Sequence, residues 1–243
     1  MCGIHASISS GGFQVPGAEL KRLLCNRGPD HVGDTRAEIE SHGTTYNLSF
    51  TSTVLALRGG RLTAQPFVDP QSGSVLCWNG EGWKIGPETI AGNDGQKIFD
   101  ALLKASTTQS SVSESNRHVF KVLNCIFGPF AFVFLDNTHK QLFFGRDRLG
   151  RRSLLYNNLE DSDTIEFSSV ADSTRGFWKE VEADGIYMLS YCSERNMEAM
   201  QQSVPSSVSS SILSVRKYPW EVNSGYSREV LQPLPRQLQE TPL

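Results

Sequence analysis

The sequence predicts an α+β protein in which strands outnumber helices. Many short segments are rich in β-branched, aromatic and apolar residues and are bounded by glycine, proline, aspartate or asparagine, which is typical of strands. Apolar residues at helical spacing occur in fewer places. Several of the strand-like segments follow one another closely along the chain, so we expect antiparallel pairing.

The predicted strands extend over the first 190 residues. In the first of them, Ile4, Ala6 and Ile8 alternate with other residues, which gives the two-residue period of a half-buried strand. The remaining predicted strands are 45–50, 53–57, 75–78, 130–135, 141–145, 164–167 and 186–189.

Three helices are predicted. The first ends before Gly28, the second begins near Asp94, a good capping residue, and the third is closed by Gly128. Residues 105–116, between the second and third helices, are rich in serine and predict an exposed loop. The apolar faces comprise Leu20, Leu23 and Leu24 in the first helix, Ile98, Phe99, Leu102 and Leu103 in the second, and Val119, Val122, Leu123 and Ile126 in the third.

The composition is that of a soluble globular protein. The 243 residues are 38% hydrophobic and 20% charged, and a chain of this length can bury a core without disulfides or metals. The formal net charge of -3 offers no electrostatic footprint for nucleic acid or an anionic membrane, so we expect neither as a partner. The 5 cysteines form no Cys-x-x-Cys pair, which favours neither a disulfide framework nor a zinc site.

The chain shows no targeting signal. Its N-terminus lacks the basic region and apolar run of a signal peptide, and no apolar stretch approaches the length of a membrane span. These features predict a reduced, cytoplasmic protein. We expect one folded domain over residues 2–200, followed at 201–243 by a linker or disordered tail that is rich in serine, proline and glutamine.

Cys2 is the first candidate catalytic residue. Once Met1 is removed, the thiol and a free α-amine belong to the same residue. This amine has an ordinary pKa of about 7.7–8.0 and can accept the thiol proton, so one residue supplies both nucleophile and base. A cysteine at position 2 is a weak signal on its own, because most such cysteines are inert.

Asn79-Gly80-Glu81 follows an apolar strand and has two interpretations. Asn-Gly is a common turn dipeptide, and the motif alone would be interpreted as a turn. The functional alternative is an oxyanion hole, because an asparagine amide and a following backbone N–H can both point at a developing negative charge.

Three further motifs also have structural alternatives. Asn93-Asp94-Gly95 is either an N-cap or a carboxylate for a substrate ammonium. Arg27-Gly28-Pro29-Asp30 reads as a helix stop and a turn, which does not account for the whole tetrapeptide. Residues 145–154 read as a charged hairpin or solvated loop between two strands.

The motifs occur along the chain in the order Cys-Gly-Ile, Arg-Gly-Pro-Asp, Asn-Gly-Glu, Asn-Asp-Gly and Gly-Arg-Asp-x-x-Gly-Arg. In order and content, this set resembles the class II glutamine amidotransferases, which are N-terminal-nucleophile hydrolases. The resemblance covers roughly residues 2–190. Within the class, the Arg-Gly-Pro-Asp motif is similar to the corresponding motif of the asparagine synthetase branch.

The resemblance implies a four-layer αββα sandwich, with two antiparallel sheets between layers of helices. It implies that Cys2 attacks the side-chain amide carbon of L-glutamine, while the Asn79 amide and the Gly80 N–H stabilise the oxyanion. Glu81 and Asp94 are implied to hold the substrate α-ammonium. Ammonia then leaves and water hydrolyses the thioester to glutamate, without a metal or an organic cofactor.

The resemblance also implies an arginine that binds the substrate α-carboxylate as a bidentate pair. Members of the class commonly carry Arg-Leu-Ser after a strand, and Arg61-Leu62-Thr63 is the nearest match here. We favour Arg58, because it directly follows the strand predicted at 53–57 and a residue at a strand end is well fixed. Arg61 is the alternative.

Three functions remain open. The first is a glutaminase domain that supplies ammonia to asparagine-synthetase-type amide transfer by a synthetase domain in cis or in trans. The second is a catalytically silent regulatory or interaction module with the same fold, and the intact motif residues argue against it. The third is an N-terminal-nucleophile amide hydrolase with another substrate.

The synthetase reaction itself is not expected of this sequence. In the class, ATP and Mg²⁺ act through a second domain with a Ser-Gly-Gly-x-Asp-Ser phosphate loop. The nearest string, Ser10-Gly11-Gly12-Phe13, lacks Asp-Ser and lies inside the first domain. We therefore expect that synthetase domain to be absent from these 243 residues.

Overall fold

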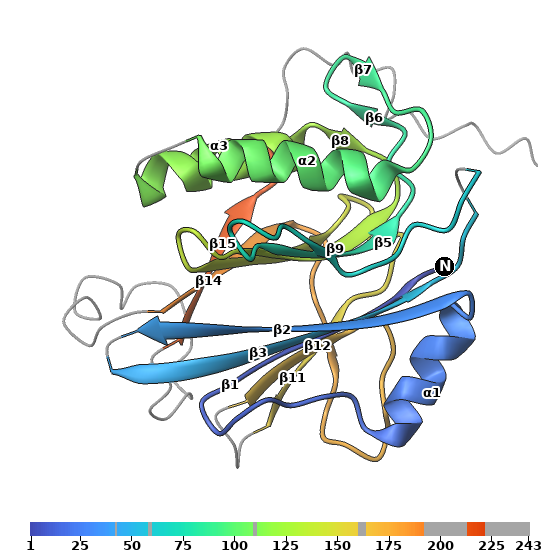
Figure 1. The fold of residues 1–243 in the computed structure, drawn as a ribbon, viewed down its shortest axis with the longest axis vertical. Coiled ribbons are helices and arrows are strands. Elements are labelled where there is room, and N and C mark those ends of the chain that lie inside the picture. Colours follow the sequence, from blue (N-terminus) through green and yellow to red (C-terminus); the bar gives the residue numbers. More distant parts are fainter. Residues whose placement is uncertain (42, 58–59, 109–110, 160–163, 192–212, 222–243) are drawn as a thin grey trace, which may run out of the picture.

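The computed structural model describes residues 1–41, 43–57, 60–108, 111–159, 164–191 and 213–221. These residues form four layers in the order helix, sheet, sheet, helix (Figure 1). Helices α2 (Asp94–Thr107) and α3 (Val112–Asn124) cover one sheet, and α1 (Ala18–Arg27) lies against the other. The αββα sandwich expected from the family resemblance is confirmed.

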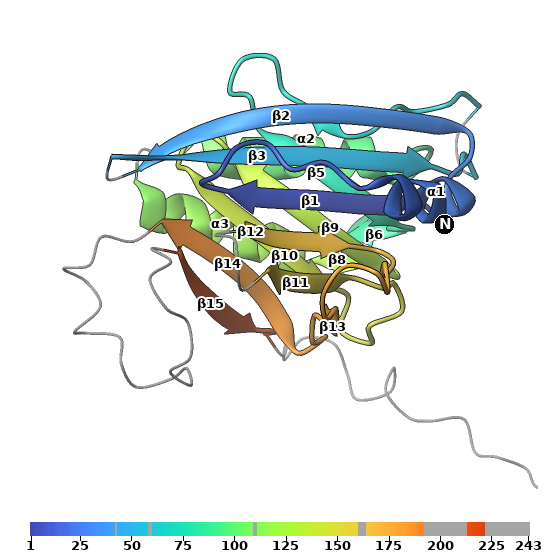
Figure 2. The ribbon, with the colours of Figure 1, turned by 90° about the horizontal axis from the view of Figure 1, so that it is seen from below.

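The first sheet has the strand order β13-β11-β12-β1-β3-β2, and its neighbours pair antiparallel. Seen from below, β1, β3 and β2 run side by side at its front (Figure 2). The central strand β1 begins one residue after Cys2, so this sheet fixes the start of the chain. Its strands are β1 (Gly3–Ser9), β2 (His31–Ser41), β3 (Thr44–Val54), β11 (Leu155–Leu159), β12 (Thr164–Ser168) and β13 (Lys179–Glu180).

The second sheet has the order β15-β14-β10-β9-β5-β4 and is also antiparallel. A small sheet, β7-β6-β8, lies at the edge of the helical layer. The strands of these two sheets are β4 (Phe67–Val68), β5 (Val75–Gly80), β9 (Phe130–Asp136), β10 (Gln141–Arg146), β14 (Gly185–Tyr191) and β15 (Leu213–Pro219), and β6 (Lys84–Ile85), β7 (Glu88–Thr89) and β8 (Ile126–Phe127).

Two hydrophobic cores separate the layers. The first lies between the sheets, where the ring centroids of Phe144 and Phe167 are 4.4 Å apart. The second lies between the second sheet and its helices, and includes Trp78 of β5 and Leu102 of α2. Alternate residues of β5 therefore contribute to different cores, because successive side chains of a strand point to opposite faces. No helix among the described residues is long and apolar enough to span a membrane.

Several predicted boundaries are wrong. Segments 45–50 and 53–57 are not two strands, because β3 continues through the polar residues between them and ends at Val54. Thr51 is buried, and its hydroxyl donates to Asp34 of β2, 2.5 Å away. The polar residues in the middle of β3 therefore include a cross-strand hydrogen bond and do not end the strand. Strands β2 and β11 were not predicted from the sequence. The third helix ends at Asn124, and Ile126 belongs to β8.

The serine-rich segment 105–116 is largely helical, contrary to prediction. Hydroxyl groups of Thr107 and Thr108 donate to helix carbonyls at the end of α2. The Ser111 side chain then accepts a hydrogen bond from Glu114 N, 3.2 Å away, and begins α3. Serine and threonine therefore act here as helix end groups, which composition alone did not reveal.

The predicted tail also contains a strand. β15 lies within 201–243 and pairs with β14 from Tyr191 opposite Leu213 to Gly185 opposite Pro219. The boundary at residue 200 is therefore wrong for this strand. The rest of the predicted tail, apart from Trp220 and Glu221, lies outside the described residues.

Candidate active site

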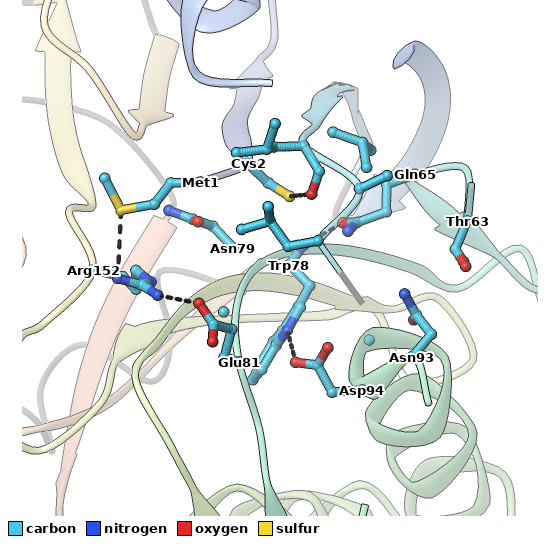
Figure 3. Close-up of a pocket in the computed structure, with 16 residues that line it drawn as sticks. Met1, Cys2, Thr63, Gln65, Trp78, Asn79, Glu81, Asn93, Asp94 and Arg152 are labelled. Carbon is cyan, nitrogen blue, oxygen red and sulfur yellow. Dashed lines mark hydrogen bonds and ion pairs between the residues drawn. The ribbon is translucent and has the colours of Figure 1, made fainter. Parts of the chain in front are cut away.

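A pocket of about 570 Å³, open to solvent, lies where the N-terminus meets the ends of β3 and β5 and the start of α2 (Figure 3). It brings together five of the residues singled out in the sequence. They are Cys2, Asn79, Gly80, Glu81 and Asp94. The other lining residues are Met1, Val54, Leu55, Ala56, Leu57, Thr63, Gln65, Trp78, Asn93, Gly95 and Arg152.

Arg27 holds the backbone of Cys2. Its Nε donates to the Cys2 carbonyl, 3.2 Å away, from the last residue of α1. Gly28 then lets the chain pass against β3, because a β-carbon there would lie 2.5 Å from the backbone of Thr53. The helix stop in Arg-Gly-Pro-Asp thus also anchors the nucleophile.

Asp30 completes the same motif. Its Oδ2 accepts a hydrogen bond from Ala56 N at 2.8 Å, and its backbone N–H donates to Val54 O at 3.0 Å. These bonds fix the segment after β3 beside Cys2, whose Sγ lies 4.0 Å from Leu55 O. The tetrapeptide therefore positions both Cys2 and the pocket wall opposite it.

Asn79 presents an unused donor to the pocket. Its residue is 1% exposed, and its Nδ2 has no hydrogen-bond partner among the described residues. A buried amide without a partner is costly, so a donor left in this state is typical of a site for an acceptor that is not yet bound. Figure 3 shows this amide on the same side of the pocket as Met1 and Cys2.

The Gly80 N–H faces the same space. Trp78 N donates to Gln65 Oε1 at 2.9 Å, whereas Glu81 N donates to Pro129 O at 2.9 Å, on the β9 side. Since N–H groups alternate along a strand, that of Gly80 points to the Gln65 side. β4 pairs with β5 at Val75 and Leu76, and no strand among the described residues pairs with this edge of β5 at Gly80.

Asp94 is a buried carboxylate at a helix N-terminus. The sequence predicted it as a possible cap, but Asn93 caps α2 by accepting from Gln96 N at 3.1 Å. Asp94 Oδ2 instead accepts from Trp78 Nε1 at 2.9 Å and from Gly82 N at 2.7 Å. Because Asn93 satisfies the helix end, Asp94 remains available to the pocket.

Glu81 lies at the mouth of the pocket and is paired with Arg152. Arg152 Nη2 is 2.9 Å from Glu81 Oε1, and its Nη1 lies 3.4 Å from the sulfur of Met1. No role was predicted for Arg152 from the sequence. The only signal was its place within the motif at 145–154, whose arginines look alike in sequence.

The loop after β10 presents Arg152 rigidly, contrary to its interpretation as a solvated loop. Arg146 is buried, and its guanidinium donates to the carbonyls of Arg152 and Gly150. The buried Asp147 carboxylate accepts hydrogen bonds from Phe130 N and from the backbone and side chain of Arg151. The charges of this motif thus stabilise its backbone.

Burial changes both titratable groups at the N-terminus. It raises the pKa of the Cys2 thiol above its ordinary value, which disfavours the thiolate while Met1 is present. It lowers the pKa of the Met1 amine, an effect that the charges of Arg27 and Arg152 reinforce. The Met1 amine is therefore biased towards its neutral form.

The described residues do not place either candidate for the carboxylate clamp at the pocket. Arg58 lies outside the described residues, and β3 ends at Val54 and not directly before it. The reason given for preferring Arg58, its position at a strand end, is therefore not supported. Arg61 is exposed and is not among the residues that line the pocket.

Comparison with known families identifies the family and the fold of this chain. A family model described as a glutamine amidotransferase domain matches residues 1–217. The chain belongs to this glutamine amidotransferase family. The match includes most of β15, in agreement with its pairing in the second sheet.

Solved structures carry the same fold as this amidotransferase domain. One described as the allosteric regulatory enzyme of purine biosynthesis has a TM-score of 0.53 at 13% identity, covering 76% of this chain and 46% of that one. Glutamine phosphoribosylpyrophosphate amidotransferase from Bacillus subtilis has a TM-score of 0.51 at 12% identity, covering 76% and 46%.

Curated relatives of the amidotransferase domain are named asparagine synthetase domain-containing protein 1. The Bos taurus protein is 34% identical over 237 residues, which cover 93% of this chain and 32% of the relative. The Homo sapiens protein is 30% identical over 230 residues, covering 91% and 31%. The chain therefore spans about a third of the length of these relatives.

Proposed function

We propose that this domain hydrolyses L-glutamine to glutamate and ammonia through a thioester on Cys2. One observation carries the proposal: the Asn79 amide nitrogen, which has no hydrogen-bond partner in the described part of the chain, is buried in the same pocket as the Cys2 thiol. A turn would leave that amide in water or bonded to the backbone. A donor held unused beside a nucleophile fits the stabilisation of an oxyanion.

The first half of the reaction acylates the enzyme. After Met1 is removed, the α-amine of Cys2 accepts the thiol proton, and the sulfur attacks the side-chain amide carbon of glutamine. The Asn79 amide and the Gly80 N–H stabilise the tetrahedral oxyanion. The intermediate collapses with cleavage of the C–N bond, the proton passes from the amine to the leaving nitrogen, and ammonia leaves a thioester.

The second half releases glutamate. Water loses a proton to the same amine and attacks the thioester carbon, and the same two donors stabilise the second oxyanion. The C–S bond then breaks, and the sulfur recovers the proton. Asp94 and Glu81 hold the α-ammonium, and Arg58, or Arg61 as the alternative, binds the α-carboxylate. Neither half-reaction requires a metal or an organic cofactor.

We propose that the released ammonia is consumed in asparagine-synthetase-type amide transfer. Support comes from relatives named for an asparagine synthetase domain, which are about three times as long as this chain. ATP and Mg²⁺ would act only through such a synthetase domain, in cis or in trans. Purified protein given aspartate, MgATP and ammonium is expected to form no asparagine, as checked by amino-acid analysis.

The direct test is a glutaminase assay on purified protein whose N-terminus is confirmed as Cys2 by mass spectrometry. Equal amounts of glutamate and ammonia are expected from L-glutamine, and none from the Cys2→Ala variant. Binding of L-glutamine without turnover would indicate a catalytically silent module. Turnover of other amides in preference to L-glutamine would indicate an amide hydrolase with a different substrate.

A further inference from the structure

The indole of Trp78 touches two functional parts of the pocket at once. Trp78 lies on β5, and its Nε1 donates to Asp94 Oδ2 at 2.9 Å. A β-carbon on Gly80 would lie 2.8 Å from ring atoms Cε2 and Cζ2, so the ring rests directly on the Gly80 backbone. One rigid side chain therefore contacts both the proposed oxyanion donor Gly80 and the proposed ammonium acceptor Asp94.

The surrounding structure fixes this ring. Trp78 is 2% exposed and stacks on Phe130 of β9, with ring centroids 5.1 Å apart and an interplanar angle of 19°. On its other side, a β-carbon on Gly95 of α2 would lie 3.4 Å from Trp78 Cδ1. The indole cannot rotate without displacing β9 or the first turn of α2.

The carboxylate of Asp94 depends on this ring for its orientation. Both of its hydrogen bonds, from Trp78 Nε1 and Gly82 N, go to Oδ2. The second oxygen points away from the indole (Figure 3). A buried carboxylate that accepts two hydrogen bonds on one oxygen is held in one orientation, and loss of one donor weakens that orientation.

We propose that Trp78 is a positioning residue that makes the pocket selective for amides carrying an α-ammonium. Its ring sets the spacing between Gly80 and Asp94, and its N–H orients the Asp94 carboxylate towards the substrate. The inference rests on the proposed function for the identity of the substrate. The free energy that Trp78 contributes is separate from catalysis, because it concerns binding of the substrate ammonium and not cleavage of the amide bond.

The test compares two substrates in the Trp78→Phe variant. L-glutamine carries the α-ammonium, whereas 4-carbamoylbutanoate has the same amide and carboxylate without it. The KM for L-glutamine is expected to rise roughly tenfold, the equivalent of about 1.4 kcal/mol, with little change in kcat. Kinetics with 4-carbamoylbutanoate should stay within roughly twofold of the unsubstituted protein.

Trp178→Phe is the matched control. It also removes an indole hydrogen bond, 3.1 Å long to Asp172 O, but Trp178 does not line the pocket. This variant should leave both substrates unaffected. An equal loss for both substrates in Trp78→Phe would reduce Trp78 to a packing residue and overturn the inference, as would no change for either.

Two further measurements keep the test decisive. If Trp78→Phe does not fold, 3-benzothienylalanine at position 78 preserves the ring shape and removes only the N–H. Calorimetric binding in a Cys2→Ala background requires no turnover. There, removal of the indole N–H should weaken L-glutamine binding roughly tenfold and leave 4-carbamoylbutanoate binding unchanged.

This binding measurement also separates the two proposals. A protein whose L-glutamine binding depends on the Trp78 N–H, but which never hydrolyses L-glutamine, would contradict the glutaminase function. The positioning role of Trp78 would still stand. If Cys2→Ala with Trp78 intact binds L-glutamine no better than 4-carbamoylbutanoate, the positioning role is wrong.

Discussion

Arg152 Nη2 lies 2.9 Å from Glu81 Oε1, so one of the two carboxylates expected to hold the substrate ammonium already has a cationic partner. The Glu81 side chain is 46% exposed, whereas Asp94 is 4% exposed and begins α2. Solvent and Arg152 both weaken the attraction of Glu81 for an ammonium. The two acidic residues are therefore not equivalent.

Substitutions at these two positions should differ in size. Asp94→Asn removes a buried charge and should raise the KM for L-glutamine roughly 30-fold or more. Glu81→Gln removes an exposed and paired charge and should raise it only about two- to fivefold. Steady-state kinetics measure both. A larger effect at Glu81 would mean that Glu81 turns away from Arg152 when the substrate binds.

Loss of the Asn79 amide should act on the transition state. Asn79→Ala is expected to lower kcat by roughly 10²–10³, the usual cost of one oxyanion donor, with little change in KM. Asn158→Ala, on the exposed side of β11, is a matched asparagine control and should behave as the unsubstituted protein. Unchanged kcat in Asn79→Ala would show that Asn79-Gly80 is only a structural element.

Cys2 and Cys77 should react at different rates with a thiol reagent. Burial raises the pKa of Cys77 to about 12, so at pH 8 this thiol is almost wholly protonated, besides being enclosed in the core. Burial also raises the pKa of Cys2 while Met1 is present, which lowers its thiolate fraction at any pH below that pKa.

Iodoacetamide at pH 8 should therefore label Cys2 faster in protein that begins at Cys2 than in protein that retains Met1. Cys77 should stay unlabelled in both until the protein is unfolded. Peptide mass spectrometry gives the two rates. Equal rates at Cys2 would argue against any influence of Met1 on this thiol.

Gly80 should be required for stability as well as for catalysis. A β-carbon there would lie 2.7 Å from Phe130 Cβ and 2.8 Å from the Trp78 ring. Gly80→Ala should lower the free energy of unfolding by about 1–3 kcal/mol, the range for overpacking of a core. Gly11→Ala, whose β-carbon meets only ordinary contact distances, should change it little. Urea denaturation of both variants makes the comparison.

The sequence predicted strands and helices best where apolar residues recur regularly or form a continuous run. β1 was found from the alternation of Ile4, Ala6 and Ile8, β9 from its apolar run and α2 from its helical spacing, although every residue of β1 and β9 is buried. β2 was missed because most of its residues alternate between exposed and half-buried, with a single fully buried position at Ile39. As an edge strand, it owes its existence to pairing with β3, which no local pattern encodes.

The site was predictable where several individually weak motifs, taken in their order along the chain, resembled one family. Cys2, Asn79 and Asp94 converge on one pocket as the resemblance implied. Arg152 was not found, because its role depends on the buried Arg146 and Asp147 that shape the loop, and four arginines in that loop look alike in sequence. Trp78 was overlooked because alternation along β5 places it in the core, and its polar contact becomes visible only once α2 is in place.

The pairing of β15 determines where this chain can be shortened for recombinant production. Tyr218 packs on Phe120, with ring centroids 3.9 Å apart, and Trp220 Nε1 donates to Ala183 O at 2.9 Å. Protein ending at residue 200 would leave β14 with an unpaired row of backbone N–H and C=O groups, which is a template for association between chains. Yield and monodispersity should therefore depend on keeping the chain through Glu221.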